Sequence, residues 1–388
     1  MRAAQTTGVV VALGSAQTIS WASSYYLPAV LATPMARDLD VSPVWIFAAF
    51  SVAMLISALV APWNGVRIDR LGGRGVLIIS NVIFTTGLAL LAIAPSFAVL
   101  VVAWIIIGIG MGMGLYEAAF ATLAGIYGSA ARSPITGITL IAGFASTLGW
   151  PLSALMDAHI GWRGACLGWA ALQLLVALPL NVLLPVGVQP PQERQEPASP
   201  EEAKASRLTM LLLAYVFAVT LFVSTSLATH LPRLLEAAGA TTAVAIAAGA
   251  LIGPAQVAAR VGEFSLLRHM HPLLTARIAA LASPLGAMLL ILLGAPAAYA
   301  FTLLHGAGNG IMTIAKGTLP LALFGAGGYG FRQGLLVAPG RILQASAPLI
   351  FGFALEHFGA NAIWLTMSLS LTALLALLGI TMIRPASA

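Results

Sequence analysis

The stretch Asn64-Gly65-Val66-Arg67-Ile68-Asp69-Arg70-Leu71-Gly72-Gly73-Arg74 lies between two long apolar runs. It holds four charged residues and a Gly-Gly pair, whereas residues 43–63 and 75–95 on either side hold no charged residue. Glycine pairs favour chain reversal because glycine adopts backbone angles that other residues avoid. The stretch therefore predicts a tight, basic turn between two hydrophobic helices.

The composition excludes a water-soluble domain. Hydrophobic residues make up 60% of the 388 positions and charged residues only 8%, against about a quarter charged in an ordinary soluble domain. Apolar runs of about 18 residues or more recur along the chain, and each can cross a hydrocarbon core of about 30 Å as a helix. Barrel strands would instead alternate over short segments. We therefore expect an all-α integral membrane protein.

Twelve apolar segments follow one another along the chain. Between the sixth and the seventh lies a stretch rich in proline and charged residues, which is typical of a flexible linker. The sequence thus predicts six helices in residues 1–187, a linker over 188–206 and six helices in 207–388. The segments are 8–33, 43–63, 75–95, 97–126, 133–156, 162–186, 208–232, 241–265, 273–294, 297–322, 332–356 and 361–383.

The two halves of the chain resemble each other. The fourth segment contains Gly108-x-Gly110-x-Gly112, and the tenth contains Gly306-x-Gly308-x-Gly310 about 198 positions later. The Pro-Leu pairs at 151–152 and 348–349 are separated by nearly the same offset. Two motifs at one offset indicate an internal repeat of six helices.

The turn also carries a family signature. Its pattern G-x-x-x-D-R-x-G-x-R resembles the one that the major facilitator superfamily of secondary transporters places between its second and third membrane helices. The resemblance implies two six-helix bundles, a substrate site near the membrane midplane and transport by alternating access. It also implies that this loop latches the cytoplasmic ends of the bundles. The residues that match are Gly65, Asp69, Arg70, Gly72 and Arg74.

The basic residues predict the orientation in the membrane. Arginines and lysines in short loops stay on the cytoplasmic side. Most of the basic residues fall in alternate loops that share one side with the predicted linker, and only three fall in the opposite loops. We therefore expect a protein of the cytoplasmic (inner) membrane with both termini cytoplasmic. The three opposite residues are Arg37, Arg163 and Arg233.

Charged residues inside the predicted membrane segments are the main site candidates. An ionised group at the bilayer centre costs at least about 2.5–3.5 kcal/mol, so it persists only beside a cavity or a partner. Arg341 lies about 15 Å from the cytoplasmic end of its segment, Glu117 about 13 Å and Arg260 about 9 Å. Each shares a helical stripe with small or polar residues, as a cavity-lining helix would.

The roles of these three residues stay open. We expect Arg341 to bind substrate, because no acid follows it within one helical turn. Arg260 either binds substrate or pairs with Glu263 and reaches the cytoplasmic face. Glu117 is either the packed partner of an arginine or a proton carrier.

Four uncharged or weakly basic residues are further substrate-binding candidates. Trp21 and Tyr25 in the first segment either pack or grip a planar organic ligand. His305 and Asn309 lie in the tenth segment, where a histidine either hydrogen-bonds a neighbouring helix or carries protons. A lone cysteine, Cys166, lies in an apolar run and indicates packing.

Several classes of function are not expected. The glycines around 108–114 follow no strand and precede no phosphate-binding lysine, so a nucleotide site is not indicated. The basic residues form no dense run, which speaks against nucleic acid binding. We expect no enzymatic activity, no cofactor and no metal site, and we expect a monomer whose partners are a small substrate, the lipid bilayer and, in one interpretation, protons.

Two branches of the resembled family compete. Proton-driven drug exporters carry an arginine where this chain has Trp104, and a Gly-Pro pair where it has Gly149-Trp150-Pro151. Oxalate/formate antiporters and monocarboxylate transporters are similar in their aromatic first helix, and they clamp an anion with basic residues in the eighth and eleventh helices. Arg260 and Arg341 fall in those helices. Arginine suits a carboxylate because it donates two hydrogen bonds and stays charged when desolvated.

The sequence therefore predicts a transporter for a small organic anion, most simply a carboxylate, coupled to protons or working by exchange. A drug or metabolite efflux antiporter is the alternative within the family. A membrane sensor that binds ligand without moving it is the alternative from another class.

Overall fold

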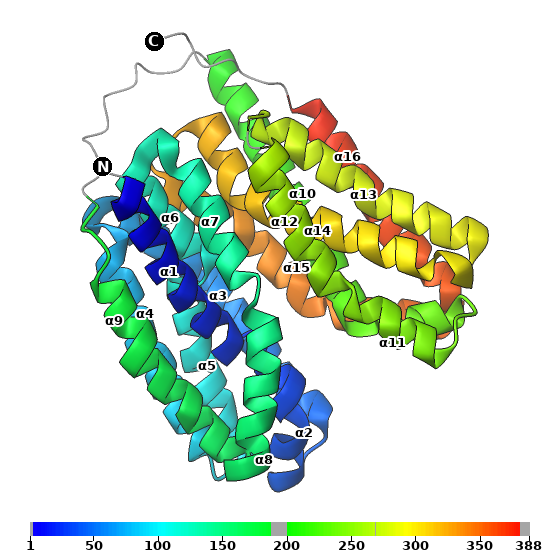
Figure 1. The fold of residues 1–388 in the computed structure, drawn as a ribbon, viewed down its shortest axis with the longest axis horizontal. Helices are drawn as coiled ribbons and strands as arrows, with labels where there is room; N and C mark the ends of the chain where they lie inside the picture. Colours follow the sequence, from blue (N-terminus) through cyan, green and yellow to red (C-terminus); the bar gives the residue numbers. More distant parts are fainter. Residues whose placement is uncertain (1–2, 188–199, 268, 381–388) are drawn as a thin grey trace. The chain divides into compact units, whose positions relative to one another are not determined.

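The computed structural model describes residues 3–187, 200–267 and 269–380, and within these ranges every regular element is helical (Figure 1). Contacts divide the chain into two compact units. The first comprises Met1–Pro191 with Gly325–Ala338, and the second comprises Gln192–Phe324 with Pro339–Ala388. Of the predicted linker, 188–199 lies outside the described residues, and a helix begins at Pro200.

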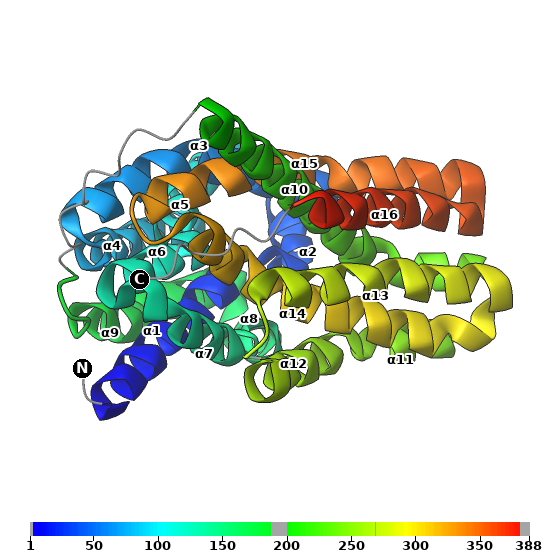
Figure 2. The same ribbon diagram turned by 90° about the horizontal axis from the view of Figure 1, so that it is seen from above.

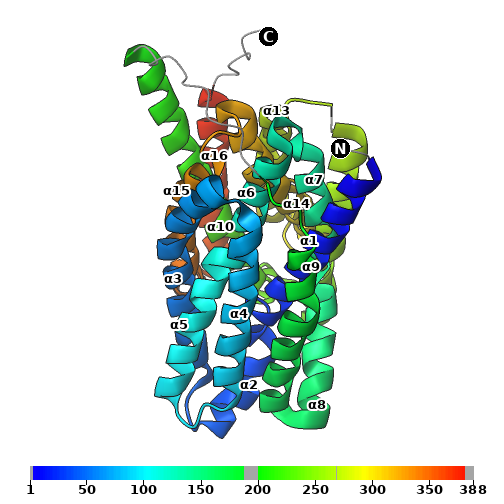
Figure 3. The ribbon, with the colours of Figure 1, turned by 90° about the vertical axis from the view of Figure 1, so that its left-hand side faces the viewer.

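The first unit is a bundle of helices built from the predicted first six segments. In it α3 and α4 both pack against α5, and α1 packs against α7 and α8 (Figure 3). Its helices are α1 (Ala3–Ser23), α2 (Pro28–Asp38), α3 (Pro43–Leu71), α4 (Gly73–Ala92), α5 (Phe97–Gly114), α6 (Tyr116–Tyr127), the 3-10 turn η1 (Gly128–Ala131), α7 (Arg132–Ala142), α8 (Ala145–Leu172), the π-helical turn η2 (Gln173–Ala177) and α9 (Leu178–Val182).

The second unit holds the remaining segments. In it α13 lies beside α14 and α16, and α12 packs against α14 (Figure 2). Helix α15 begins in the part that groups with the first unit and ends in the second. The helices are α10 (Pro200–Ala237), α11 (Thr242–Ala250), α12 (Ile252–Gly262), the π-helical turn η3 (Glu263–Leu267), α13 (Pro272–Leu293), η4 (Ala295–Ala297), α14 (Ala298–Phe324), α15 (Tyr329–Phe358), η5 (Gly359–Ala362) and α16 (Ile363–Gly379).

Each of the twelve predicted apolar segments coincides with helix over most of its described length, and 381–383 of the twelfth lie outside the described residues. By length and composition, seven helical stretches of the described chain can cross a membrane, and Phe97–Val182 and Tyr329–Gly379 are longer than one crossing needs. A single crossing takes about 20 residues. The expectation of an all-α membrane fold is therefore confirmed.

The turn predicted over 64–74 is much shorter than expected. Helix α3 continues to Leu71 and α4 starts at Gly73, so the reversal is made by Gly72 alone, with φ 81° and ψ 155°. The helix continues because Asn64, Gly65 and Ile68 are buried on its packed face. Two features require glycine at 72. Its φ is positive, which other residues avoid, and a Cβ there would lie 2.7 Å from the carbonyl oxygen of Gly187.

Four predicted segments are interrupted in the middle. The first is non-helical over 24–27, where Pro28 opens α2 and cannot donate a backbone hydrogen bond. The fourth breaks at Leu115, whose ψ of −168° is extended. The fifth breaks at 143–144 and the eighth at Leu251. The hydropathy pattern does not show these breaks because the residues at them are themselves mostly apolar or aromatic.

The glycines of α5 bring three helices into close contact. A Cβ on Gly108 would lie 2.5 Å from the carbonyl oxygen of Ala53 on α3, and one on Gly110 would lie 3.0 Å from the ring of Phe84 on α4. Small residues thus let α3 and α4 approach from two sides.

The glycines of α14 do the same in the second unit. A Cβ on Gly310 would lie 2.5 Å from the carbonyl oxygen of Gln256 on α12, and one on Gly308 would lie 2.6 Å from that of Ala279 on α13. The motif repeated at an offset of about 198 positions therefore makes the same kind of contact in both units.

Candidate functional site

The two arginines singled out from the sequence are both buried in the second unit. Arg341 on α15 is 4% exposed and Arg260 on α12 is 5% exposed. Nε of Arg260 donates to the carbonyl oxygen of Gly310 at 3.4 Å, and Nη2 donates to Oε1 of Gln256 at 3.5 Å. The glycine at 310 leaves its carbonyl accessible, so packing of α12 on α14 places the guanidinium against backbone.

Arg341 lies on a polar side of α15 that packs on α10. Gly340 contacts Ala218 of α10, and Gln344, one turn after Arg341, donates from Nε2 to Oγ1 of Thr225 at 2.9 Å. Residues three apart share a helix face. Arg341 and Gln344 therefore belong to one buried polar strip within the second unit.

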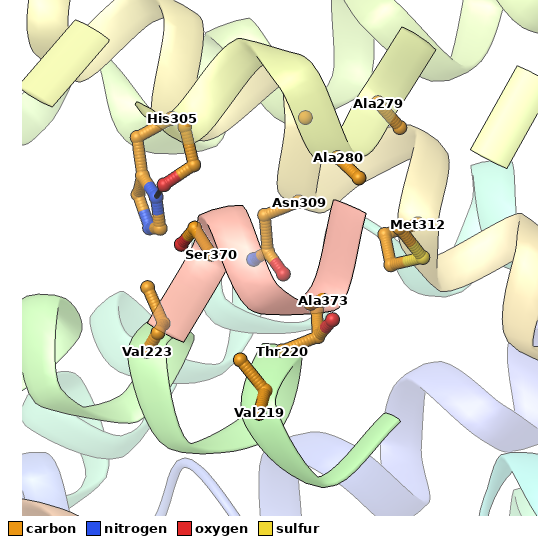
Figure 4. Close-up of a pocket in the computed structure, with 12 residues that line it drawn as sticks. Val219, Thr220, Val223, Ala279, Ala280, His305, Asn309, Met312, Ser370 and Ala373 are labelled. Atoms are coloured by element: carbon orange, nitrogen blue, oxygen red, sulfur yellow. Dashed lines mark hydrogen bonds between the residues drawn. The ribbon is translucent and has the colours of Figure 1, made fainter. Parts of the chain in front are cut away.

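His305 and Asn309 line a small pocket inside the second unit (Figure 4). Nδ1 of His305 lies 3.3 Å from Oγ of Ser283. Thr220 of α10 and Ser370 of α16 add two further hydroxyl groups to the lining. The structure thus brings two predicted substrate-binding residues together with hydroxyls from three other helices.

This pocket is separate from the arginines and is small. Neither Arg260 nor Arg341 lines it, and it leaves about 40 Å³ open to the centres of water-sized molecules. One water needs about 10–15 Å³ by that measure. The pocket therefore suits a few water molecules and is too small for an organic anion.

Trp21 and Tyr25 belong to an aromatic cluster in the first unit. Their ring centroids are 5.2 Å apart and their planes meet at 66°, edge to face. The ring centroid of Tyr116 on α6 lies 4.9 Å from that of Trp21, with the planes tilted by 47°. Edge-to-face pairs of this kind are favoured by the charge distribution of aromatic rings. Tyr116 was not among the predicted site residues, because its place beside Trp21 depends on the packing of α1 against α6.

Glu117 lies in the first turn of α6, directly after the break at Leu115. A carboxylate is favoured there because the first N–H groups of a helix carry partial positive charge. On the other side of the break, the buried side chain of Gln17 donates from Nε2 to the carbonyl oxygen of Gly114 at 2.6 Å. An amide on α1 thus satisfies one of the carbonyls that the end of α5 leaves open.

Asp69 caps the start of α15. Its Oδ1 accepts from the N–H of Gly330 at 2.8 Å and its Oδ2 from the N–H of Phe331 at 2.9 Å. These donors are in the first turn of the helix, where backbone N–H groups have no partner in the helix itself. Gly65 packs directly on the backbone of Gly330.

The other signature residues play different parts. Gly72 makes the turn described above, Arg70 is exposed and Arg74 is half-buried. The signature therefore combines one capping carboxylate, two glycines needed for close approach and a positive φ, and two arginines at the surface of the first unit.

A buried amide network in the first unit was missed by the sequence reasoning. Nδ2 of Asn81 donates to Oε1 of Gln173 at 2.7 Å, Nδ2 of Asn181 donates to Oδ1 of Asn81 at 2.7 Å, and Nε2 of Gln173 donates to Oγ of Ser23 at 2.8 Å. Single polar residues inside apolar segments were the available signal, since such residues usually bond across helices. The network ties α4, η2 and α9 to the end of α1.

Metal binding finds no support in the part of the chain that the structure describes. No group of three or more His, Cys, Asp or Glu residues there is placed to hold a metal ion.

Comparison with known proteins shows the family. The model described as Major Facilitator Superfamily matches residues 13–338, which is most of the chain. The chain therefore belongs to the major facilitator superfamily, a family of transporters and not of enzymes.

Two curated relatives are similar to about half of this chain. The 3-(3-hydroxy-phenyl)propionate transporter of Escherichia coli is 32% identical over 200 residues, covering 50% of this chain and 48% of the relative. A multidrug resistance protein B homolog of Mycobacterium tuberculosis is 30% identical over 226 residues, covering 58% of this chain and 38% of the relative. The chain thus spans about half or less of the length of these relatives.

Solved structures share the fold over nearly the whole chain. The human organic anion transporter MFSD10 superposes with a TM-score of 0.72 at 19% identity, covering 96% of this chain and 99% of its own. The fucose transporter FucP in its outward conformation gives 0.74 at 15% identity, covering 96% and 98%. At these identities the likeness establishes the architecture alone.

Proposed function

We propose that this transporter moves a small organic anion with a carboxylate group across the cytoplasmic membrane by alternating access, as a monomer with both termini cytoplasmic. The observation that carries the proposal is the pair of buried arginines, Arg260 and Arg341, in one unit. Buried cations are costly unless they serve a pathway or meet a partner. An arginine fork matches a carboxylate with two charge-assisted hydrogen bonds.

The Escherichia coli relative supports the same class of substrate. Its name states that it transports a propionate derivative, which is a carboxylate at neutral pH. In this proposal Arg341 and Arg260 bind the anion directly. The substrate role predicted for His305 and Asn309 stays a prediction, and their pocket has the size for water to mediate it.

Glu117 is the residue that we assign to coupling. It is a half-buried carboxyl near the middle of a membrane segment, at the start of α6. A carboxyl in that position can bind a proton when the site opens to one side and release it on the other. Exchange of one anion for another is the second mode, and it needs no proton on Glu117.

Uptake into proteoliposomes tests the proposal. We expect the purified protein to take up a labelled short carboxylate. Arg341→Gln and Arg260→Gln should each lower uptake at least about tenfold, because each removes a charged hydrogen-bond partner of the carboxylate. Such a hydrogen bond typically contributes about 1.5–3 kcal/mol. Arg233→Gln is the matched control, since Arg233 is an exposed arginine of the same unit. Unchanged uptake by a folded Arg341→Gln protein would contradict the site assignment.

Drug or metabolite efflux is the second candidate, and the multidrug resistance homolog among the relatives favours it. A thermal-shift screen separates the two candidates, because a ligand that binds the folded protein raises its unfolding temperature. Stabilisation by carboxylates is expected. Stabilisation by lipophilic cations alone would replace the anion proposal with efflux, and binding without flux would indicate a sensor.

A further inference from the structure

Eight aromatic rings form one connected cluster in the first unit. Neighbouring centroids are 4.9 to 6.2 Å apart, and most pairs meet edge to face or tilted. Such contacts stabilise the rings beyond the burial of their area, so they hold the rings in place. The rings are those of Trp21, Tyr25, Tyr26, Phe50, Trp104, Tyr116, Phe120 and Trp150.

The cluster is centred on two helix breaks that lie side by side. Tyr25 and Tyr26 are in the non-helical stretch between α1 and α2, and Tyr116 is the first residue of α6 after the break at Leu115. The hydrogen bond from Gln17 to the Gly114 carbonyl ties α1 to that second break. At about 1.5 Å per residue, the first break ends about 9 Å before the far end of the predicted segment 8–33.

The rings at the breaks are accessible, whereas those behind them are not. Trp21, Tyr25 and Tyr116 are half-buried, while Trp104 and Phe120 are 0% and 2% exposed. Non-helical backbone at membrane depth occurs where it is covered by protein or lines a water-filled cavity, not against lipid. Trp21, Tyr25 and Tyr116 are the members of the cluster that keep exposed surface directly beside the two breaks.

A second observation points to a ligand at this place. Gln17 is 1% exposed, and its Oε1 has no hydrogen-bond partner among the residues that the structure describes. Gln17 is one turn before Trp21, so the two side chains share a face of α1. A buried amide oxygen without a partner is destabilising, and a hydrogen-bond donor placed beside it would remove that cost.

We propose that Trp21, Tyr25 and Tyr116 form a subsite that receives a planar aromatic ring, so that the substrates are aryl-substituted organic anions. The proposal rests on the anion transport proposed above and names the substrate class. A flat ring adds to an edge-to-face cluster as a further member, whereas a saturated ring of the same size has no π face to offer.

Uptake of two matched carboxylates tests the subsite. 3-Phenylpropionate and 3-cyclohexylpropionate carry the same charged group on the same chain and differ in the aromaticity of the ring. We expect the wild-type protein to take up the phenyl compound with a kcat/KM about three- to tenfold higher, which is what one or two ring contacts supply. Trp21→Leu and Tyr116→Leu are expected to remove this preference, and Trp21→Phe to keep part of it.

Trp45→Leu is the matched control, because the ring of Trp45 pairs with that of Phe97, and neither ring belongs to the cluster. Its preference should equal that of the wild type. Equal uptake of both compounds by the wild-type protein would overturn the subsite and leave anion transport standing. Uptake of neither carboxylate would overturn anion transport and the subsite together. The uptake ratio of the two compounds by the wild-type protein tests the subsite by itself, so the test does not depend on whether every variant folds.

Discussion

Helices α5 and α14 carry the same motif of three glycines, and α5 continues the spacing with one further glycine, Gly114. In α5 the glycines at 108 and 110 allow close packing of α3 and α4. In α14 those at 306 and 308 allow close packing of α12 and α13. Yet α14 runs without interruption from Ala298 to Phe324, whereas α5 stops at Gly114 and a new helix starts at Tyr116.

The difference follows from the residue after the shared motif. At the offset of 198 positions, Gly114 of α5 corresponds to Met312 of α14. Glycine is about 1 kcal/mol worse than alanine in a helix, while methionine is a good helix former. Gly114 also allows Ser80 and Phe84 of α4 to approach closely. The additional glycine at 114 therefore favours the end of α5, and the new helix α6 then has Glu117 in its first turn.

The largest effect is expected where the two helices are alike. Gly108→Ala and Gly310→Ala each push a Cβ against backbone, so each should lower the free energy of unfolding by about 1–3 kcal/mol. Thermal unfolding in detergent measures this. Gly253→Ala in α12 is the control, since nothing lies within 4 Å of a Cβ there, and a loss as large in that variant would show that steric contact is not the cause.

A somewhat smaller effect is expected at the break. Gln17→Leu leaves the Gly114 carbonyl without its donor, at about 1–2 kcal/mol. Thr313→Val in α14, at the position that corresponds to Leu115, removes only a bond to the carbonyl four residues earlier and should cost less than about 0.5 kcal/mol. Equal losses in the same unfolding measurement would show that the break does not depend on Gln17.

Asp69→Asn tests whether the capping of α15 by the signature loop matters for transport. Asparagine accepts fewer of the two N–H groups of α15 and carries no charge, so about 0.5–2 kcal/mol of capping is lost. We expect the transport rate to fall several-fold while the dissociation constant of the substrate stays the same. Stopped-flow uptake together with equilibrium binding measures both, and a matching loss of affinity would argue against a purely conformational role.

Glu117→Gln is expected to have the smallest effect on stability, about 0.3–1 kcal/mol, because it removes one charge at a helix N-terminus. Its transport effect separates the two modes of coupling. Uptake driven by a pH gradient should be lost while exchange of labelled for unlabelled anion continues. Preserved pH-driven uptake would exclude Glu117 as the proton carrier.

Much of the fold could be predicted from residue chemistry alone. The segments are set by apolar runs long enough to cross a bilayer, and each of them coincides with helix. The glycine repeat predicted two related halves, and its contacts recur in both units. The candidate site was predicted less completely. Arg260 and Arg341 could be recognised as charges in apolar segments, whereas the contacts of Tyr116 and Gln173 depend on which residues of other helices lie beside them.

The sequence by itself determined that this chain is a helical membrane protein of two similar halves with buried arginines, because hydropathy, length and charge act locally along the chain. Only the tertiary structure decided that Gly72 alone makes the turn, that α5 breaks at Leu115, that His305 and Asn309 share a pocket without the arginines, and that Trp21 meets Tyr116. Each of these depends on which helix faces which, and helices separated by about a hundred residues meet through packing that no local pattern encodes.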